Sequence, residues 1–243
     1  MSETRWFERA ELLLRDRTNV LRSANVLVVG MGGVGSYAAE FIARAGVNRM
    51  TIVDGDVVDI TNINRQLPAL HSTVGQSKVQ LMAARIKDIN PNIELTVLEE
   101  FLSPERAYEL VTPDFDVVLD CIDSVTPKLM LLLSAKRKKV RIVSSMGAGG
   151  KMDASQVKVA DISQTHSCYF AKTIRKRLRK LGVNKGIRAV YSTEIQDEAS
   201  LKMTDGSNYK KSFYGTISFM PALFGLRAAE DAIKYLLNRN KDA

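Results

Sequence analysis

Residues 25–46 read NVLVVGMGGVGSYAAEFIARAG and predict how the chain folds. An apolar, β-branched run at 25–29 leads directly into the glycine turn 30–35, and a segment with helical spacing follows at 36–45. Short, continuously apolar strands are typical of parallel sheets that helices cover on both faces. Glycines between such a strand and a helix permit a tight turn and leave the N–H groups of the helix N-terminus open to a phosphate. We therefore expect a nucleotide-binding α/β fold.

Strands and helices alternate along the first part of the chain, with further strands at 50–53, 93–98, 116–119 and 140–144 and helices at 5–22, 75–89 and 128–138. This alternation predicts a doubly wound, Rossmann-like α/β fold with a mostly parallel sheet. A C-terminal elaboration follows, with expected strands at 157–160 and 189–193, helices at 172–181 and from Pro221, and a polar loop at 197–212. The apolar stripe of the last helix is expected to comprise Leu223, Leu226, Ala229, Ile233, Leu236 and Leu237. We predict one domain over 1–243, with a nucleotide-binding core at 1–150 and a basic elaboration at 151–243.

The composition limits the classes of protein that the chain can represent. Its 243 residues are 45% hydrophobic and include only two cysteines, which argues against disorder, collagen and a disulfide scaffold. The charged N-terminus does not resemble a signal peptide, and no apolar run approaches the roughly 18 residues of a membrane span. A cytoplasmic protein without stable membrane insertion is therefore expected.

The net charge of +8 is unevenly distributed along the chain. Residues 128–188 hold 16 Lys and Arg but two Asp, a balance of +14, whereas the rest of the chain carries −6. Ile174, Leu178 and Leu181 would share one face of the predicted helix at 172–181, which leaves the cations around it: Lys172, Arg175, Lys176, Arg177, Arg179 and Lys180. These cations suit the phosphates of a nucleic acid, but a membrane surface and a solvated face remain alternatives.

Polar residues suited to phosphate chemistry follow the glycine turn. Asp54 ends the second predicted strand, where an acidic residue accepts hydrogen bonds from ribose hydroxyls. Arg65 and Lys78 could neutralise charge that develops on a phosphoryl group, and Asp123, which follows another strand, could hold Mg²⁺. Their co-occurrence favours attack on a nucleotide phosphate over hydride transfer.

Four segments, VLVVGMGGVGS, IVDGDVVDITNINRQ, GQSK and DCIDS, resemble the adenylating domain shared by ubiquitin-activating enzymes and the bacterial ThiF and MoeB proteins. The resemblance implies ATP binding and activation of a carboxylate as an acyl-adenylate. It implies that adenosine and phosphates contact Gly30, Gly32, Gly33, Gly35, Asp54 and Asp56, that the triphosphate contacts Asn62, Arg65, Gln66 and Lys78, and that Asp123 coordinates Mg²⁺. Arg9 lies where the family places an arginine that reaches into the site of the neighbouring subunit, so the implied catalytic set is Arg9, Arg65, Lys78 and Asp123.

Three later segments, SSMGAGGK, YSTE at 191–194 and GTISFMPALFG, resemble one branch of this family, the bacterial tRNA threonylcarbamoyladenosine dehydratases. The resemblance implies ATP-dependent dehydration and cyclisation of the threonylcarbamoyl group on tRNA by a homodimer. It makes tRNA the expected partner of the basic helix. Two alternatives remain: adenylation of the C-terminal Gly-Gly of a ubiquitin-like sulfur carrier, with a cysteine desulfurase or sulfur acceptor as partner, and a nucleotide-sensing RNA-binding scaffold without turnover.

The two cysteines do not identify a nucleophile. The chain lacks the C-x-x-C pairs that hold structural zinc in sulfur-carrier-activating members. Cys121 ends an apolar strand and is expected to be a core residue. Cys168 lies near His166, so both a thiol relay and an incidental position stay open. Intramolecular attack on an activated carboxylate needs no nucleophile from the enzyme.

Overall fold

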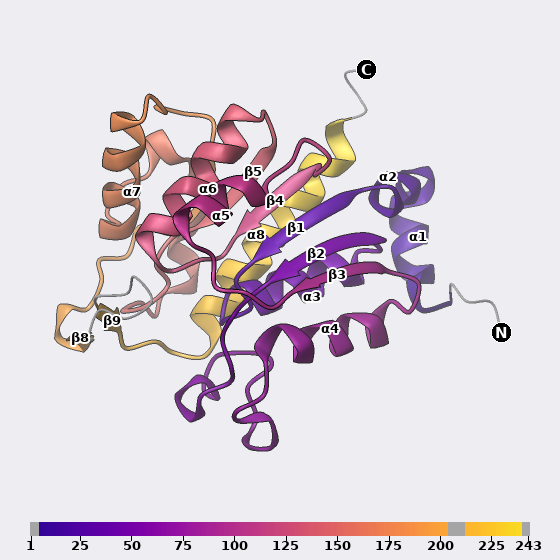
Figure 1. The fold of residues 1–243 in the computed structure, drawn as a ribbon, viewed down its shortest axis with the longest axis horizontal. Helices are drawn as coiled ribbons and strands as arrows, with labels where there is room; N and C mark the ends of the chain where they lie inside the picture. The colour runs from indigo at the N-terminus through magenta and orange to yellow at the C-terminus, as the bar shows by residue number, and fades with distance from the viewer. Residues whose placement is uncertain (1–4, 204–211, 240–243) are drawn as a thin grey trace.

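The computed structural model describes residues 5–203 and 212–239, and it contains one large sheet (Figure 1). The strand order is β3-β2-β1-β4-β5-β7-β6, and each neighbouring pair is parallel except β6 with β7. The strands are β1 Asn25–Val29, β2 Arg49–Val53, β3 Glu94–Leu98, β4 Val117–Asp120, β5 Arg141–Ser145, β6 Val157–Asp161 and β7 Arg188–Ser192. The predicted doubly wound, mostly parallel α/β fold is therefore confirmed.

Helices cover both faces of the sheet. One face carries α2 Thr18–Arg22, α3 Gly35–Arg44, α4 Lys78–Ile89 and α8 Phe219–Asn238, and the other carries α5 Pro104–Leu110, α6 Val125–Arg137 and α7 Tyr169–Lys180. Side chains of a strand point alternately to opposite faces. In β1, Val26 and Val28 accordingly join the core under α3 and α8, whereas Leu27 and Val29 join the core under α6. Burial on both faces explains the continuous apolar run of this strand.

The N-terminal segment differs from the single helix expected at 5–22. It consists of α1 Glu8–Leu14 and α2, with short 3-10 turns at Arg5–Phe7 and Arg15–Arg17. Arg15 has a φ of +53°, which an α-helix does not allow. Only Phe7, Thr18 and Leu21 are buried within this segment, so packing does not hold one continuous helix in place.

Two further elements were not expected from the sequence. The short helix α5 is capped by Ser103, whose side chain accepts a hydrogen bond from the Arg106 N–H at 3.1 Å. In the region expected to be a polar loop, β8 Leu201–Met203 pairs antiparallel with β9 Ser212–Tyr214, and residues 204–211 between them lie outside the described part of the chain. Both elements are shorter than the windows in which periodicity becomes visible.

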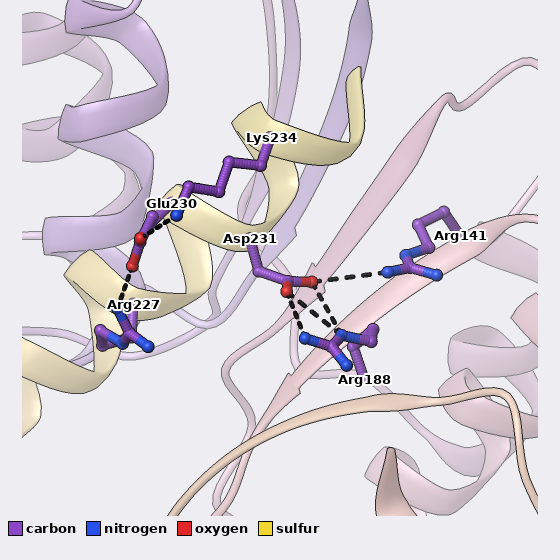
Figure 2. A network of polar contacts seen from close by, with 6 residues as sticks. All are labelled: Arg141, Arg188, Arg227, Glu230, Asp231 and Lys234. Carbon is purple, nitrogen blue, oxygen red and sulfur yellow. Dashed lines mark hydrogen bonds and ion pairs between the residues drawn. The ribbon is translucent and has the colours of Figure 1, made fainter. Parts of the chain in front are cut away.

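Helix α8 packs along the sheet with a stripe that overlaps the expected one: Ala229 and Leu236 are buried, and Leu223, Ile233 and Leu237 pack against the core. Its buried side chains include Phe224, Ala228, Ala232 and Leu236, at the regular spacing of four, whereas Leu226 is 40% exposed. Figure 2 shows Asp231 of α8 facing two arginines at the amino ends of β5 and β7. It pairs with Arg188 at 2.7 Å and with Arg141 at 3.6 Å. This ionic contact fixes the rotation of α8 about its axis, which an apolar pattern alone does not specify.

Within residues 5–203 and 212–239, no helix combines the length and the apolar character needed to cross a membrane.

Candidate nucleotide site

The glycine turn lies at the carboxyl end of β1, and its glycines have two different causes. A Cβ on Gly35 would lie 1.7 Å from the carbonyl oxygen of Gly30, and one on Gly30, which has a φ of +91°, would lie 3.0 Å from the Cys121 carbonyl oxygen. These two glycines are required by the packing of the turn itself. A Cβ on Gly32 would meet nothing closer than the Gln66 side-chain amide at 3.8 Å. Packing therefore does not require Gly32, and its missing side chain leaves space above the turn.

Asp54, directly after β2, joins the glycine turn to the loop that follows β2 through two hydrogen bonds. One carboxylate oxygen accepts from the Met31 N–H at 2.5 Å, and the other accepts from the Asp56 N–H at 2.7 Å. Burial raises the pKa of Asp54, although these hydrogen bonds and Lys78 oppose the shift. A carboxylate offers about four acceptor positions, so each oxygen retains capacity for a ribose hydroxyl. Asp54 thus orders the turn, a role that the sequence did not suggest.

Lys78 and Asp56 form an ion pair at the start of α4. The Lys78 ammonium lies 3.0 Å from the Asp56 carboxylate, and the Lys78 N–H donates to the Asp56 carbonyl oxygen at 3.0 Å. The Lys78 side chain is 6% exposed, whereas that of Asp56 is 47% exposed. The lysine is therefore held in place by a partner that remains open to solvent.

The segment 61–66 brings Arg65 and Gln66 against the glycine turn. Arg65 donates to the Thr61 carbonyl oxygen at 2.8 Å and to the Asn64 side chain at 2.9 Å, and its backbone oxygen would lie 3.2 Å from a Cβ on Gly33. The Oε1 atom of Gln66 is buried and finds no hydrogen-bond partner among the residues that the structure describes. A buried acceptor without a partner is costly, which favours a ligand that donates to it.

Asn62 is buried, and its side chain stabilises the short turn that precedes Arg65. Its side-chain oxygen accepts from the Asp59 N–H at 3.2 Å, while Asp59 accepts from the Thr61 N–H at 2.8 Å. These reciprocal bonds cap the short 3-10 turn Ile60–Asn62. In this conformation Asn62 orders the loop that presents Arg65.

Asp123 is exposed in the turn between β4 and α6, on the same edge of the sheet. Burial lowers the pKa of the Arg65 guanidinium, and the negative charges of Asp123 and Asp59 oppose this shift. Across residues 5–203 and 212–239, no group of three or more His, Cys, Asp or Glu could hold a metal ion. Mg²⁺ is usually held by one or two carboxylates together with substrate phosphates and water, so a single carboxylate beside a phosphate site fits this ion.

Other sequence-predicted residues lie away from this edge. Arg9 is exposed on α1, which precedes α2 beyond the amino end of β1, so its own chain does not bring it to the glycine turn (Figure 1). On α7, Lys172, Lys176, Arg177, Arg179 and Lys180 are exposed. Arg175 is only partly exposed, and its guanidinium donates to the Thr165 carbonyl oxygen at 2.8 Å. Leu181, expected on the buried face, is 42% exposed because α7 ends at Lys180.

Neither cysteine is presented as an activated nucleophile. Burial raises the pKa of Cys121 to about 12, and the residue packs against the core beneath α3. Cys168 is 3% exposed and directly precedes α7. His166 is exposed and meets Tyr191 edge-on rather than holding a catalytic pair together.

A buried ion pair between Asp120 and Lys128, which sequence reasoning missed, lies directly beneath the Asp123 turn. The available signal was a lone cation beside Leu129, Leu131 and Leu132, because a lysine on the apolar side of a helix needs a partner.

An open α/β sheet that gathers a glycine turn, two cations and a carboxylate at its carboxyl edge defines a nucleotide-binding protein. The chain belongs to the ThiF family, whose model matches residues 8–243. It is 45% identical over 237 residues to the tRNA threonylcarbamoyladenosine dehydratase of Bacillus subtilis, with 90% of each chain covered. The resemblance to the dehydratase branch is thereby confirmed.

Two further comparisons separate the branches of the family. The crystal structure of the Escherichia coli tRNA N6-threonylcarbamoyladenosine dehydratase in complex with ATP matches with a TM-score of 0.88 at 34% identity, covering 98% of this chain and 96% of that one. The molybdopterin-synthase adenylyltransferase of Escherichia coli is 34% identical over 154 residues, 63% of this chain and 60% of the relative. The dehydratase likeness therefore includes the C-terminal elaboration.

Proposed function

We propose that the chain catalyses the ATP-dependent dehydration of threonylcarbamoyladenosine in tRNA and closes a ring through an acyl-adenylate. The observation that carries this proposal is the placement of Arg65 against the glycine turn, where the Asp123 charge acts on it, beside the unpartnered Gln66 oxygen. The near full-length likeness to the Bacillus subtilis dehydratase supports the choice of substrate.

The reaction balances without an enzyme nucleophile. A threonyl carboxylate oxygen attacks the α-phosphorus of ATP, and pyrophosphate leaves with the electron pair of the broken P–O bond. The carbamoyl group of the same modification then attacks the activated carbonyl carbon, AMP leaves, and one proton is released. The product has lost one water, whose oxygen departs in AMP. Ring closure within one modification gains a large proximity advantage, so no enzyme nucleophile is required.

The residues at the carboxyl edge have complementary roles in this scheme. Arg65 and Lys78 stabilise charge on the reacting phosphates, and Asp123 would hold Mg²⁺, which would neutralise further phosphate charge. Gln66 binds a donor of the nucleotide. The adenosine and phosphates lie against Gly30, Gly32, Gly33 and Gly35, with Asp54, Asp56 and Asn62 ordering the loops.

The basic helix α7 binds tRNA phosphates through its exposed cations. Ala171, Ile174 and Leu178 bury one face against the core, so Lys172, Lys176, Arg177, Arg179 and Lys180 remain available outside. Removing one cation that binds a phosphate should lower the salt slope of tRNA binding by about 1. We expect this for Arg177→Ala but not for the matched control Lys87→Ala, which removes an exposed cation from α4 on the opposite face. An unchanged slope in variants of all five cations would place the tRNA elsewhere.

The enzyme acts as a cytoplasmic homodimer in this proposal. An apolar groove between α3 and α8 is lined by Phe41, Ala45, Leu226 and Ile233, and its rim carries the oppositely charged Arg44 and Glu230. A second copy offers the same mixed charges, which an isologous interface requires. Arg9, remote from its own site, is then supplied to the partner's site.

A mixing experiment tests this shared site. Arg9→Ala and Arg65→Ala should each be inactive alone, but subunits that have been exchanged should recover activity. Half of the mixed dimers are heterodimers with one intact site of two, so about a quarter of the wild-type rate is expected. No recovery, with exchange verified by mass spectrometry, would place Arg9 outside the partner's site.

The main experiment is incubation of the wild-type protein with ATP, Mg²⁺ and modified tRNA, followed by nucleoside mass spectrometry. A nucleoside lighter by one water is expected, and Lys87→Ala should behave like the wild type. An unchanged mass with protein that binds ATP would contradict the dehydratase.

The match to the molybdopterin-synthase adenylyltransferase favours sulfur-carrier activation as the second candidate. That candidate, with a cysteine desulfurase or sulfur acceptor as partner, predicts ATP–pyrophosphate exchange that depends on a small protein ending in Gly-Gly.

A further inference from the structure

The ion pair between Asp120 and Lys128 is fully enclosed in the protein. Both side chains are 0% exposed, and the Lys128 ammonium lies 2.7 Å from an Asp120 carboxylate oxygen. The ring of Phe170, the second residue of α7, lies 5.7 Å from the ammonium. None of the nucleotide-binding roles described above requires this pair.

The two side chains hold the peptide groups on both sides of Ile122. The Ile122 N–H donates to one Asp120 oxygen at 3.2 Å, and the Lys128 ammonium donates to the Ile122 carbonyl oxygen at 2.8 Å. Ile122 directly precedes Asp123, so the pair defines the backbone from which the Asp123 side chain extends. The other Asp120 oxygen accepts from the Ser144 hydroxyl at 2.6 Å, which ties the arrangement to the neighbouring strand β5.

The same turn touches the glycine turn from the other side. Cys121 and Ile122 contribute the atoms nearest to a Cβ on Gly30, and the Cys121 Cβ would lie 3.0 Å from one on Gly35. A shift of Ile122 would therefore move Asp123 and disturb the floor of the phosphate turn together. The pair controls the relative position of these two parts of the site.

Stability alone does not account for a pair in this position. The free-energy cost of moving two charges out of water can exceed the gain from their mutual attraction. Replacing a buried ion pair by apolar residues is therefore often neutral or stabilising. A fixed hydrogen-bond direction is something that an apolar pair cannot supply. The consequence of this pair is therefore that its hydrogen bonds fix the backbone of the turn, rather than that it adds to the stability of the fold.

We propose that Asp120 and Lys128 are positioning residues that hold the Cys121–Ser124 turn so that Asp123 faces the phosphate site. The inference rests on the proposed role of Asp123 in binding Mg²⁺ and deepens that role. Neither residue contacts the nucleotide itself.

The test compares Lys128→Met with the double variant Asp120→Asn/Lys128→Met. Lys128→Met leaves a buried carboxylate without its cation, and Tm should fall by about 10 °C. In the double variant, asparagine can still accept from the Ile122 N–H and pair with Ser144, so most of this loss in Tm should be recovered. The Ile122 carbonyl oxygen, however, still lacks the lysine.

We expect kcat to stay lowered by about 10- to 100-fold in the double variant, as is usual when a supporting partner of a metal ligand is removed. The KM for ATP should change much less, and half-maximal activity should need more Mg²⁺. A purely structural pair predicts that kcat and the Mg²⁺ requirement recover together with Tm, and that result would overturn the inference. Arg188→Met/Asp231→Leu is the matched control: it removes an ion pair at the opposite edge and should alter Tm without altering the Mg²⁺ requirement.

Calorimetric titration with ATP, in the presence and absence of Mg²⁺, makes the result independent of the tRNA reaction. The wild type should gain ATP affinity from Mg²⁺, and the double variant should lose most of that gain. A wild type that shows this gain but does not convert the nucleoside would contradict the proposed function and not the positioning pair. An equal gain in both proteins, or none in the wild type, would overturn the positioning pair.

Discussion

The two edges of the sheet hold ion pairs with different surroundings. At the carboxyl edge, Asp120–Lys128 is 0% exposed on both sides and its hydrogen bonds end on a turn. At the amino edge, Asp231 is 14% exposed and the side chains of Arg188 and Arg141 are about one third exposed (Figure 2). The first pair orders a loop, whereas the second joins a helix to two strands. Variants at the two edges should therefore separate activity from stability.

The largest effect should come from Gly35→Ala at the carboxyl edge. Its Cβ would lie 1.7 Å from a backbone oxygen, so the turn must deform, and the free energy of unfolding should fall by more than about 4 kcal/mol. Gly32→Ala is the matched control, because nothing lies closer than 3.8 Å to its Cβ. Chemical denaturation should find Gly32→Ala folded, while ATP titration finds its affinity reduced. A stable Gly35→Ala protein would show that the turn tolerates rearrangement.

Arg65→Ala should lower kcat by about 10²–10³-fold, the usual effect of losing one preorganised charge donor. Arg65 donates its side-chain hydrogen bonds to Thr61 and Asn64 within its own loop, so Tm should change little. Product formation from modified tRNA measures the effect, and Arg188→Ala provides an arginine control from the other edge. An equal loss of activity in both variants would contradict the view that only the carboxyl edge serves the reaction.

The sequence was sufficient for the parallel core of the sheet and for the common location of the turn, Asp54 and Asp123, because all three closely follow strands. Parallel strands place such residues along one edge regardless of the details of packing. It did not reveal Asp120–Lys128 or the hydrogen bond from Arg175 to Thr165. Those contacts depend on how α6 and α7 rotate against the sheet, and residue type alone does not specify this rotation.

Asp231→Ala tests the amino edge and should have a smaller effect. It removes the partner of Arg188 and Arg141 at a largely buried position, and the free energy of unfolding should fall by about 2 kcal/mol. Activity per folded molecule should equal that of the wild type at a temperature well below Tm. A fall in kcat at that temperature would show that the rotation of α8, set at the amino edge, is transmitted to the phosphate site.

Glu40 gives the smallest effect, because its ion pairs, one within α3 and one with α4, lie at neither edge of the sheet. Burial raises its pKa, but hydrogen bonds from Arg85 at 2.5 Å and Arg44 at 2.8 Å outweigh this, so the pKa is lowered in the folded protein. A lowered pKa stabilises the fold above the ordinary pKa of a glutamate, and this contribution is lost as the pH falls through the folded-state value. Glu40→Gln should therefore flatten the acid side of the stability–pH curve and cost about 1 kcal/mol near neutral pH. Urea unfolding across the acidic range measures both effects. An unchanged curve would mean that the ion pairs of Glu40 with the two arginines, each about half exposed, add nothing to the free energy of unfolding.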